Sequence, residues 1–195
     1  PLDNVEIRID NPDENGIGEV IAKGDNIMHG YYDNEEATAA VLRDGWFHTG
    51  DLGYIDKSGY LFLSGRKKNV IVLKNGKNVF PEELEAEISA LPYQMENIVV
   101  GLPKNGDDRD LVVALKIVYD PEQFAGMSKE EIEKRIHEDV EKINDRMPLY
   151  KHIKRIFVTD EPMIKTSTSK VRRFLEIEKM LEEEKKDGGT HGKQI

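Results

Sequence analysis

The stretch from Phe47 to Glu87 constrains the fold of this chain more than any other. Near its start, apolar residues alternate with polar ones on both sides of a Lys-Ser-Gly turn. This pattern predicts that Leu52–Ile55 and Tyr60–Ser64 pair as a β-hairpin, and the chain then continues through an Asn-Gly turn into a helix. The hairpin should bring two polar clusters, Thr49-Gly50-Asp51 and Gly65-Arg66-Lys67-Lys68, close together. A carboxylate and a guanidinium brought together in this way form a polar site rather than a core.

The charge pattern predicts a chain in two parts, and the strand and helix patterns predict an α+β fold. Residues 1–64 carry 13 acidic side chains against 4 basic ones, whereas residues 65–195 carry 25 against 24. Because this balance changes at the Gly-Arg-Lys-Lys cluster, we place a domain boundary there. We predict a small β-rich lobe over residues 1–65 and a compact α+β domain, a short mixed sheet flanked by helices, over 66–182. Residues 183–195 have no apolar face and are predicted to form a disordered tail.

Periodicity predicts the individual elements. In the first part, Asn34 is expected to cap a short helix that ends at Leu42, and Trp46 is expected to pack in the core. In the second part, Ser128 and Glu131 have the spacing of a capping box at the start of a helix. The other elements expected there are a helix at 81–91, an antiparallel strand pair at 95–101 and 111–118, a strand at 153–158 and a helix at 171–181.

Composition excludes several classes of protein. The chain has no cysteine, so it has no disulfides, thiolate metal sites or cysteine nucleophile, which fits a reducing compartment such as the cytoplasm. The net charge of −10 disfavours a nucleic-acid binder. No apolar run is long enough for a transmembrane segment. The five histidines have no ligand spacing, so no metal site is predicted. The first ten residues already alternate like a strand, as in a fragment of a longer protein.

Two polar segments could carry chemistry. Asp51 follows Thr49-Gly50, and it is either a solvated turn aspartate or a carboxylate that accepts hydrogen bonds from the two hydroxyls of a ribose. The segment Lys165–Arg173, KTSTSKVRR, is basic and rich in Ser and Thr. It is either a solvated loop in which Thr168 or Ser169 caps a helix, or a mobile loop that delivers a lysine to an anionic centre.

Taken together, the motifs resemble the C-terminal part of the adenylate-forming synthetases, which include acyl-CoA synthetases, luciferases and adenylation domains. Glu19 and Tyr31 lie in segments similar to the "GE…GY" motif of that family, and Met147–Tyr150 is similar to its "LPxY" segment. The segment Trp46–Asp51 resembles the ribose-binding motif, with His48 where Arg is common. The segment 65–85, GRKKNVIVLKNGKNVFPEELE, looks most like the corresponding segment of bacterial long-chain fatty acyl-CoA synthetases.

The resemblance implies a role for each candidate site residue. Asp51 and Arg66 would bind the ribose of the nucleotide, and Lys68 would be the pivot of a hinge. Gly76 and Lys77 would lie in the loop that approaches CoA. Lys170 would be the catalytic lysine of a "K-T-x-x-G-K" pattern in which Ser169 replaces Gly.

The resemblance also implies the whole reaction. A full-length enzyme would use ATP, Mg²⁺, CoA and a fatty acid, and the Mg²⁺ ligands are expected outside this chain. The resemblance is also compatible with peripheral membrane contact of the full-length enzyme. The phosphate-binding loop of the family has no counterpart here, so the isolated chain is expected to be inactive. Three alternatives stay open: a ligase for another acid or a carrier-protein acceptor, a non-catalytic binding module with the same fold, and a nucleic-acid binder using the basic residues 145–175.

Overall fold

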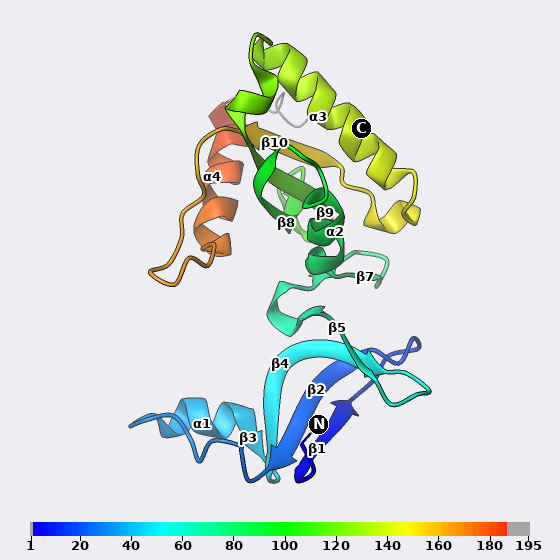
Figure 1. Cartoon of the computed structure of the whole chain (residues 1–195), viewed down its shortest axis with the longest axis vertical. Coiled ribbons are helices and arrows are strands. Elements are labelled where there is room, and N and C mark those ends of the chain that lie inside the picture. Colours follow the sequence, from blue (N-terminus) through cyan, green and yellow to red (C-terminus); the bar gives the residue numbers. More distant parts are fainter. Residues whose placement is uncertain (1, 187–195) are drawn as a thin grey trace. The chain divides into compact units, whose positions relative to one another are not determined.

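The computed structural model describes residues 2–186 and divides the chain into two compact units after Val70 (Figure 1). Residues 2–70 are called the N-terminal unit, and residues 71–186 are called the C-terminal unit. The mixed α+β fold predicted from the sequence is confirmed. No helix in residues 2–186 combines the length and the apolar character needed to span a membrane.

The N-terminal unit is built on one sheet. Strands β1, β2, β4 and β3 lie in that order, and β5 pairs with β4. A short helix, α1, precedes β3, and Asn34 caps it as predicted by accepting from Ala37 N–H at 2.9 Å. The elements are β1 Val5–Asp10, β2 Gly18–Gly24, α1 Glu35–Val41, β3 Leu42–Arg43, β4 Trp46–Ile55, β5 Leu61–Arg66 and the 3₁₀ turn η1 Lys67–Asn69.

The predicted hairpin is confirmed as β4 and β5, which pair in antiparallel register. Asp56 begins the turn by accepting from the backbone N–H groups of Ser58 and Tyr60 at 2.9 and 2.8 Å. The register sets Asp51 opposite Arg66. Because strand pairing ties Arg66 to β4, the unit extends to Val70, five residues beyond the boundary predicted from charge.

Trp46 differs from its prediction. Its ring is only partly buried, with the Arg8 guanidinium 4.6 Å and the Lys23 ammonium 5.9 Å from its centroid. The indole therefore lies beneath two cations on the sheet surface, where cation–π attraction contributes in addition to burial. Trp46 lies at the start of β4, and no second layer of apolar side chains within residues 2–70 packs on this face of the sheet to bury the indole.

The C-terminal unit is a sheet covered on both faces. A small hairpin, β6 with β7, precedes it, and the mixed sheet has the order β10-β9-β8, with β8 antiparallel and β10 parallel to β9. The elements are β6 Ile71–Val72, β7 Asn78–Val79, α2 Pro81–Ile88, β8 Gln94–Lys104, β9 Asp107–Tyr119, the 3₁₀ turn η2 Pro121–Phe124, α3 Lys129–Asn144, the 3₁₀ turn η3 Leu149–Lys151, β10 Arg155–Thr159 and α4 Arg173–Lys186.

Alternation along β9 explains the layers. Because neighbouring side chains of a strand point to opposite faces, Val113, Leu115 and Ile117 pack under α2 and α3 on one face. On the other face, Ala114 and Val118 pack against α4 and the segment before it. Figure 1 shows α3 and α4 on opposite sides of this sheet. The same alternation turns Lys116 toward α4.

The two long helices begin and end for identifiable reasons. The predicted capping box of α3 is confirmed, because Ser128 and Glu131 bond each other's backbone N–H groups. Helix α4 begins at Arg173, so the hypothesis that Thr168 or Ser169 caps it is wrong. Residues 183–186, which were predicted to be disordered, continue α4, since Glu184 pairs with Arg155 of β10 at 2.8 Å. The rest of the predicted tail, 187–195, lies outside the described residues.

Candidate functional site

Asp51 and Arg66 form the polar pair that the sequence predicted at the end of the β4–β5 hairpin. The Arg66 Nε lies 2.9 Å from Asp51 Oδ1, and Arg66 Nη1 donates to the Thr49 carbonyl at 3.3 Å. The Asp51 side chain is 31% exposed, so solvent and ligands can reach it. Gly50 adopts a φ of +72°, which favours glycine and turns the chain just before the carboxylate. The pair is therefore accessible and held by the backbone.

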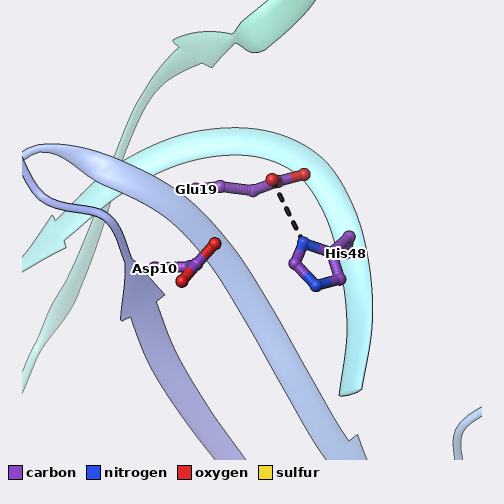
Figure 2. Close-up of side chains that lie close together, drawn as sticks. All are labelled: Asp10, Glu19 and His48. Carbon is purple, nitrogen blue, oxygen red and sulfur yellow. Dashed lines mark hydrogen bonds and ion pairs between the residues drawn. The ribbon is translucent and has the colours of Figure 1, made fainter. Parts of the chain in front are cut away.

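A buried glutamate lies beneath this turn. Glu19 of β2 accepts from Gly50 N–H at 3.1 Å and from Lys67 Nζ at 2.9 Å. It also contacts His48 Nδ1 at 3.2 Å, as Figure 2 shows. Burial alone would raise the pKa of the Glu19 carboxyl, but the hydrogen bonds from Lys67, His48 and Gly50 together lower it below its ordinary value. Glu19 is thus an ionised anchor that joins the glycine turn to the start of η1.

Asp10, Glu19 and His48 are brought together on one face of the sheet, as Figure 2 shows, with potential ligand atoms within 4.8 Å of one another. Sequence spacing could not reveal the group, because strand pairing joins positions far apart in the chain. Both Glu19 oxygens, however, already accept from other groups, one of them the Lys67 ammonium. A cation at this position repels a metal ion, so the group is better explained as a hydrogen-bonded support.

Gly76 and Lys77 lie at the tip of the β6–β7 hairpin, exposed to solvent. Gly76 N–H donates to the Leu73 carbonyl at 2.8 Å, and Lys77 N–H donates to Asn75 Oδ1 at 3.0 Å. Gly76 has a φ of +77°, and a Cβ added there would meet no atom within 4 Å. Glycine at this tip is therefore required by the positive φ and not by the close approach of a neighbouring atom.

A cavity of about 250 Å³ lies beside this hairpin within the C-terminal unit. Three lysines and one aspartate line it, together with Tyr150 and His152 of the segment around η3. The charged residues of the lining are Lys74, Lys104, Asp110 and Lys154. Lys74 lies 3.7 Å from Asp110, which leaves the lining with excess positive charge suited to an anionic ligand.

Lys170 lies at the end of a tight turn before α4. Lys165 and Val171 bridge its base, Thr166 N–H donates to the Lys170 carbonyl at 2.8 Å, and Ser169 has a φ of +60°. The Lys170 side chain is exposed, and no ion pair of its ammonium occurs within residues 2–186. The turn is thus ordered by the backbone, while the amine at its end is available.

A bidentate ion pair fixes the start of α4. Arg173 Nη2 lies 2.6 and 2.8 Å from the two oxygens of Glu85 in α2, and Arg173 Nη1 donates to the Val99 carbonyl at 2.9 Å. Glu85 also accepts from Val99 N–H at 2.7 Å. Contacts of the two terminal nitrogens with two different acceptor groups restrict the orientation of the guanidinium as well as its distance. The residue three positions after Lys170 is therefore tied to α2 and β8.

A family comparison identifies this architecture. Residues 68–184 match the model of the AMP-binding enzyme C-terminal domain, which is more than half of the chain. The chain belongs to this family.

Named relatives agree with this result. The chain is 44% identical over 109 residues to the long-chain-fatty-acid–CoA ligase FadD15 of Mycobacterium tuberculosis, covering 56% of this chain and 17% of that protein. It is 45% identical over 84 residues to the indoleacetate–CoA ligase of Aromatoleum aromaticum, covering 43% and 16%. The chain thus spans about a sixth of the length of these two relatives.

The solved structures extend the likeness to nearly the whole chain. O-succinylbenzoate CoA synthetase from Bacillus subtilis, in complex with its acyl-adenylate, has a TM-score of 0.71 and 28% identity, covering 89% of this chain and 34% of that one. The same enzyme is known in complex with ATP and magnesium ion. The relatives act on different acids, so membership of the AMP-binding enzyme family does not fix the acid.

The predicted site residues fall into three places, and Asp51 and Arg66 lie before the matched residues 68–184. Asp51 and Arg66 pair in the N-terminal unit, with exposed Lys68 in η1. Gly76 and Lys77 are neighbours on one hairpin of the C-terminal unit, and Lys170 lies on another turn of it. Roles for these residues stay predictions.

Sequence reasoning missed Lys116 and Glu176, and it placed Glu19 in a family motif without its supporting role. One signal was present for Lys116, since it is the only charged residue in the apolar run Leu111–Tyr119. Another was present for Glu176, which lies one helical turn before the buried Met180 and shares its apolar face.

Proposed function

We propose that this chain is the C-terminal part of a cytoplasmic, AMP-forming long-chain fatty acid–CoA ligase. In the first step a fatty carboxylate oxygen bonds to the α-phosphorus of ATP, and the bond to pyrophosphate breaks. In the second step the CoA sulfur bonds to the acyl carbon, AMP departs, and the thiol proton passes to solvent. The observation that carries the proposal is Lys170, exposed at the end of an ordered turn with no ion pair within residues 2–186.

Lys170 acts in the first step. Its ammonium is a compact positive charge on a flexible stem, able to bridge the attacking carboxylate and the α-phosphate oxygens. Negative charge gathers between these two groups as they approach. A cation held there orients the reactants and stabilises the charge of the transition state.

Asp51 and Arg66 hold the nucleotide through both steps. An ionised carboxylate accepts two hydrogen bonds from the vicinal hydroxyls of ribose, and the Asp51 side chain is 31% exposed for this contact. Arg66, 2.9 Å from Asp51 Oδ1, keeps the carboxylate oriented. Glu19 supports the same turn from beneath through Gly50 N–H.

The second step uses the other face of the C-terminal unit. Rotation about Lys68 withdraws Lys170 and brings the hairpin of Gly76 and Lys77 to the reacting centre, where glycine lets the backbone approach the pantetheine arm. The lysine-lined cavity beside this hairpin suits the phosphates of CoA. Mg²⁺ enters bound to ATP. Its protein ligands are expected outside this chain, because the Asp10, Glu19 and His48 group already holds the Lys67 ammonium.

A fatty acid is the favoured substrate because a long-chain ligase is 44% identical over 109 residues. The indoleacetate–CoA ligase, 45% identical over 84 residues, favours an aryl acid as the second candidate. Pyrophosphate exchange by the full-length enzyme with palmitate, octanoate and indoleacetate compares the acids, and the highest rate is expected with palmitate. A second assay then compares CoA with a carrier protein as the acceptor, and transfer to CoA alone is expected.

The half-reactions test the residue roles in that full-length enzyme. Lys170→Ala should abolish adenylate formation and leave thioester formation from supplied acyl-adenylate intact. Lys68→Pro should impair the thioester step more than the first. Equal loss of both half-reactions in Lys170→Ala would refute the role of Lys170, and an unaffected second step in Lys68→Pro would refute the hinge. Absence of any adenylation would favour the non-catalytic binding module.

A further inference from the structure

The segment that leads from β10 to Lys170 is held by carboxylates from two other elements. Ile164 N–H donates to Glu176 Oε1 of α4 at 2.7 Å. Met163 N–H, one residue earlier, donates to Glu96 Oε2 of β8 at 3.1 Å, and Glu96 Oε1 accepts from Lys165 Nζ at 2.7 Å. Consecutive backbone groups of one segment therefore bond to two separate acids.

Glu176 is held in an unusual environment for a carboxylate. It is fully buried, and Lys116 Nζ of β9 lies 2.9 Å from its Oε2 in an ion pair. The Lys116 side chain is itself only 7% exposed. Burial alone would raise the pKa of the Glu176 carboxyl, but the Ile164 N–H and the Lys116 ammonium lower it below its ordinary value. Glu176 is thus an ionised acid inside an apolar layer.

Stability does not explain this pair. Taking two charges out of water offsets most of their attraction, and apolar side chains of similar volume are often as stable. An apolar pair could fill the space between Met163 and Met180, which pack in the same layer. It could not accept a hydrogen bond from Ile164. The distinctive contribution of Glu176 is therefore the fixed position of this backbone group.

A continuous set of backbone bonds links Ile164 to Lys170. Arg172 N–H donates to the Ile164 carbonyl at 2.8 Å, and Lys165 bridges Val171. Thr166 N–H then donates to the Lys170 carbonyl at 2.8 Å. A shift at Ile164 is passed along this ladder to the base of the lysine, since each bond restrains the next.

We propose that Glu176, charge-compensated by Lys116, is a positioning residue for Lys170, with Glu96 as a second anchor of the same segment. The inference rests on the proposed function for its catalytic consequence, but its structural part concerns this chain alone. Glu176 touches no reactant. It sets where the Lys170 turn lies on the sheet, and hence where the ammonium meets the substrate.

Two double variants isolate the hydrogen-bond acceptor. Lys116→Met with Glu176→Gln removes both charges but keeps an oxygen for Ile164 N–H. Lys116→Met with Glu176→Met also removes that oxygen at nearly the same volume. Because neither variant leaves a lone buried charge, the two differ chiefly in the contact to Ile164.

Hydrogen exchange on the 195-residue chain measures the contact directly. Amides of residues 163–171 should exchange about tenfold faster in the Glu176→Met double variant than in the Glu176→Gln one, since the opening of that segment becomes easier. Amides of α3, on the other face of the sheet, should not change. Equal exchange of 163–171 in both variants would overturn the proposal.

The full-length enzyme measures the consequence. Adenylate formation should fall by about a hundredfold in the Glu176→Met double variant relative to the Glu176→Gln one, because small misplacement of a catalytic group costs this much. Thioester formation from supplied acyl-adenylate should be equal in the two. A merely structural role would lower both steps alike, and equal adenylate formation would overturn the proposal.

Two further arms separate the possible failures. If Lys170→Ala leaves adenylate formation intact, the proposed function fails, while the exchange experiment still decides the contact. If the Glu176→Met variant does not fold, Glu96→Met against Glu96→Gln carries the same comparison at the second anchor. Glu96 is partly exposed, so both of those variants should fold. Identical exchange and identical adenylate formation at that anchor would count against positioning.

Discussion

In the N-terminal unit, Glu19 lies buried beside Lys67, whose side chain is 60% exposed, whereas in the C-terminal unit Glu176 lies beside Lys116, which is 7% exposed. Glu19 also accepts from His48 and Gly50, so it depends on no single cation. Glu176 depends chiefly on Lys116, 2.9 Å away, and on one backbone group, because its other cation, Lys179, lies at 4.0 Å. A buried charge is thus supported on one face of an open sheet in one unit and inside a layered core in the other.

The cores differ in the same way. Among the described residues, the buried apolar side chains of the N-terminal unit are Val20 and Ile21, while Tyr54, Phe62 and Leu63 of its hairpin are exposed. The C-terminal unit buries two apolar clusters, one on each face of its sheet. Stability should therefore reside almost entirely in the C-terminal unit, because area removed from water supplies most of it.

The largest predicted effect is independent folding. Residues 71–195 expressed alone should unfold cooperatively on heating, whereas residues 1–70 expressed alone should show no cooperative transition, since they bury too little apolar surface. Circular dichroism during heating checks both. A sharp transition in the 1–70 peptide would break the comparison between the units.

The next effect concerns the two lysines. Lys116→Met should lower the free energy of unfolding by about 3 kcal/mol, because it leaves the buried Glu176 with only the more distant Lys179, 4.0 Å away, as a cationic partner. Lys67→Met should lower it by less than about 1 kcal/mol, since an exposed lysine contributes little and Glu19 keeps two other partners. Urea unfolding of the 195-residue chain measures both. Equal losses would show that burial of the partner does not matter.

Sequence patterns predicted most of the fold because the relevant signals are local. Alternation gave β8 and β9, the Ser128 and Glu131 spacing gave the start of α3, and strand pairing brought Asp51 to Arg66. Trp46 was misassigned because its burial depends on a second layer that a local pattern cannot reveal.

The supporting residues were harder to predict. Lys116 and Glu176 are 60 positions apart, and only the packing of α4 on the sheet makes them partners. Asp10, Glu19 and His48 meet through the pairing of three strands. Such contacts depend on tertiary structure, so sequence can flag an odd polar residue in an apolar run but not its partner.

Acid should sharpen the comparison next. Glu176 and Glu19 both have pKa values lowered from 4.5 in the folded chain. Because the pKa of each carboxyl is lower in the folded chain, the unfolded chain binds more protons than the folded chain between the two pKa values. The stabilisation is therefore present above about pH 4.5 and is lost as the pH falls through the folded value.

The free energy of unfolding of the 195-residue chain should thus decline as acid is added. Lys116→Met combined with Glu176→Gln should make this fall of the free energy of unfolding shallower. Glu19→Gln should change the fall less, because the cooperative transition belongs to the C-terminal unit. Urea unfolding between about pH 6 and pH 3 tests this, since the slope reports the difference in bound protons. An unchanged slope in the double variant would contradict the contribution of Glu176.

The smallest effect comes from the residues just before Asp51 and Lys170. Both adopt left-handed backbone, Gly50 with a φ of +72° and Ser169 with a φ of +60°. Glycine adopts this conformation without steric cost, whereas other residues are strained there by about 1–2 kcal/mol. The two units thus turn the chain in the same way before a functional side chain, but only the N-terminal unit uses the unstrained residue.

Ser169→Gly should therefore raise the free energy of unfolding by about 0.5–1 kcal/mol, because relief of strain exceeds the added entropy of the unfolded chain. The matched change Ser167→Gly, at a position without positive φ, should leave it unchanged or slightly lower. A gain of this size raises the melting temperature by about 1–4 °C in a chain of this length. Equal effects of the two changes would show that Ser169 is not strained, and the difference between the two turns would then lie in side-chain contacts alone.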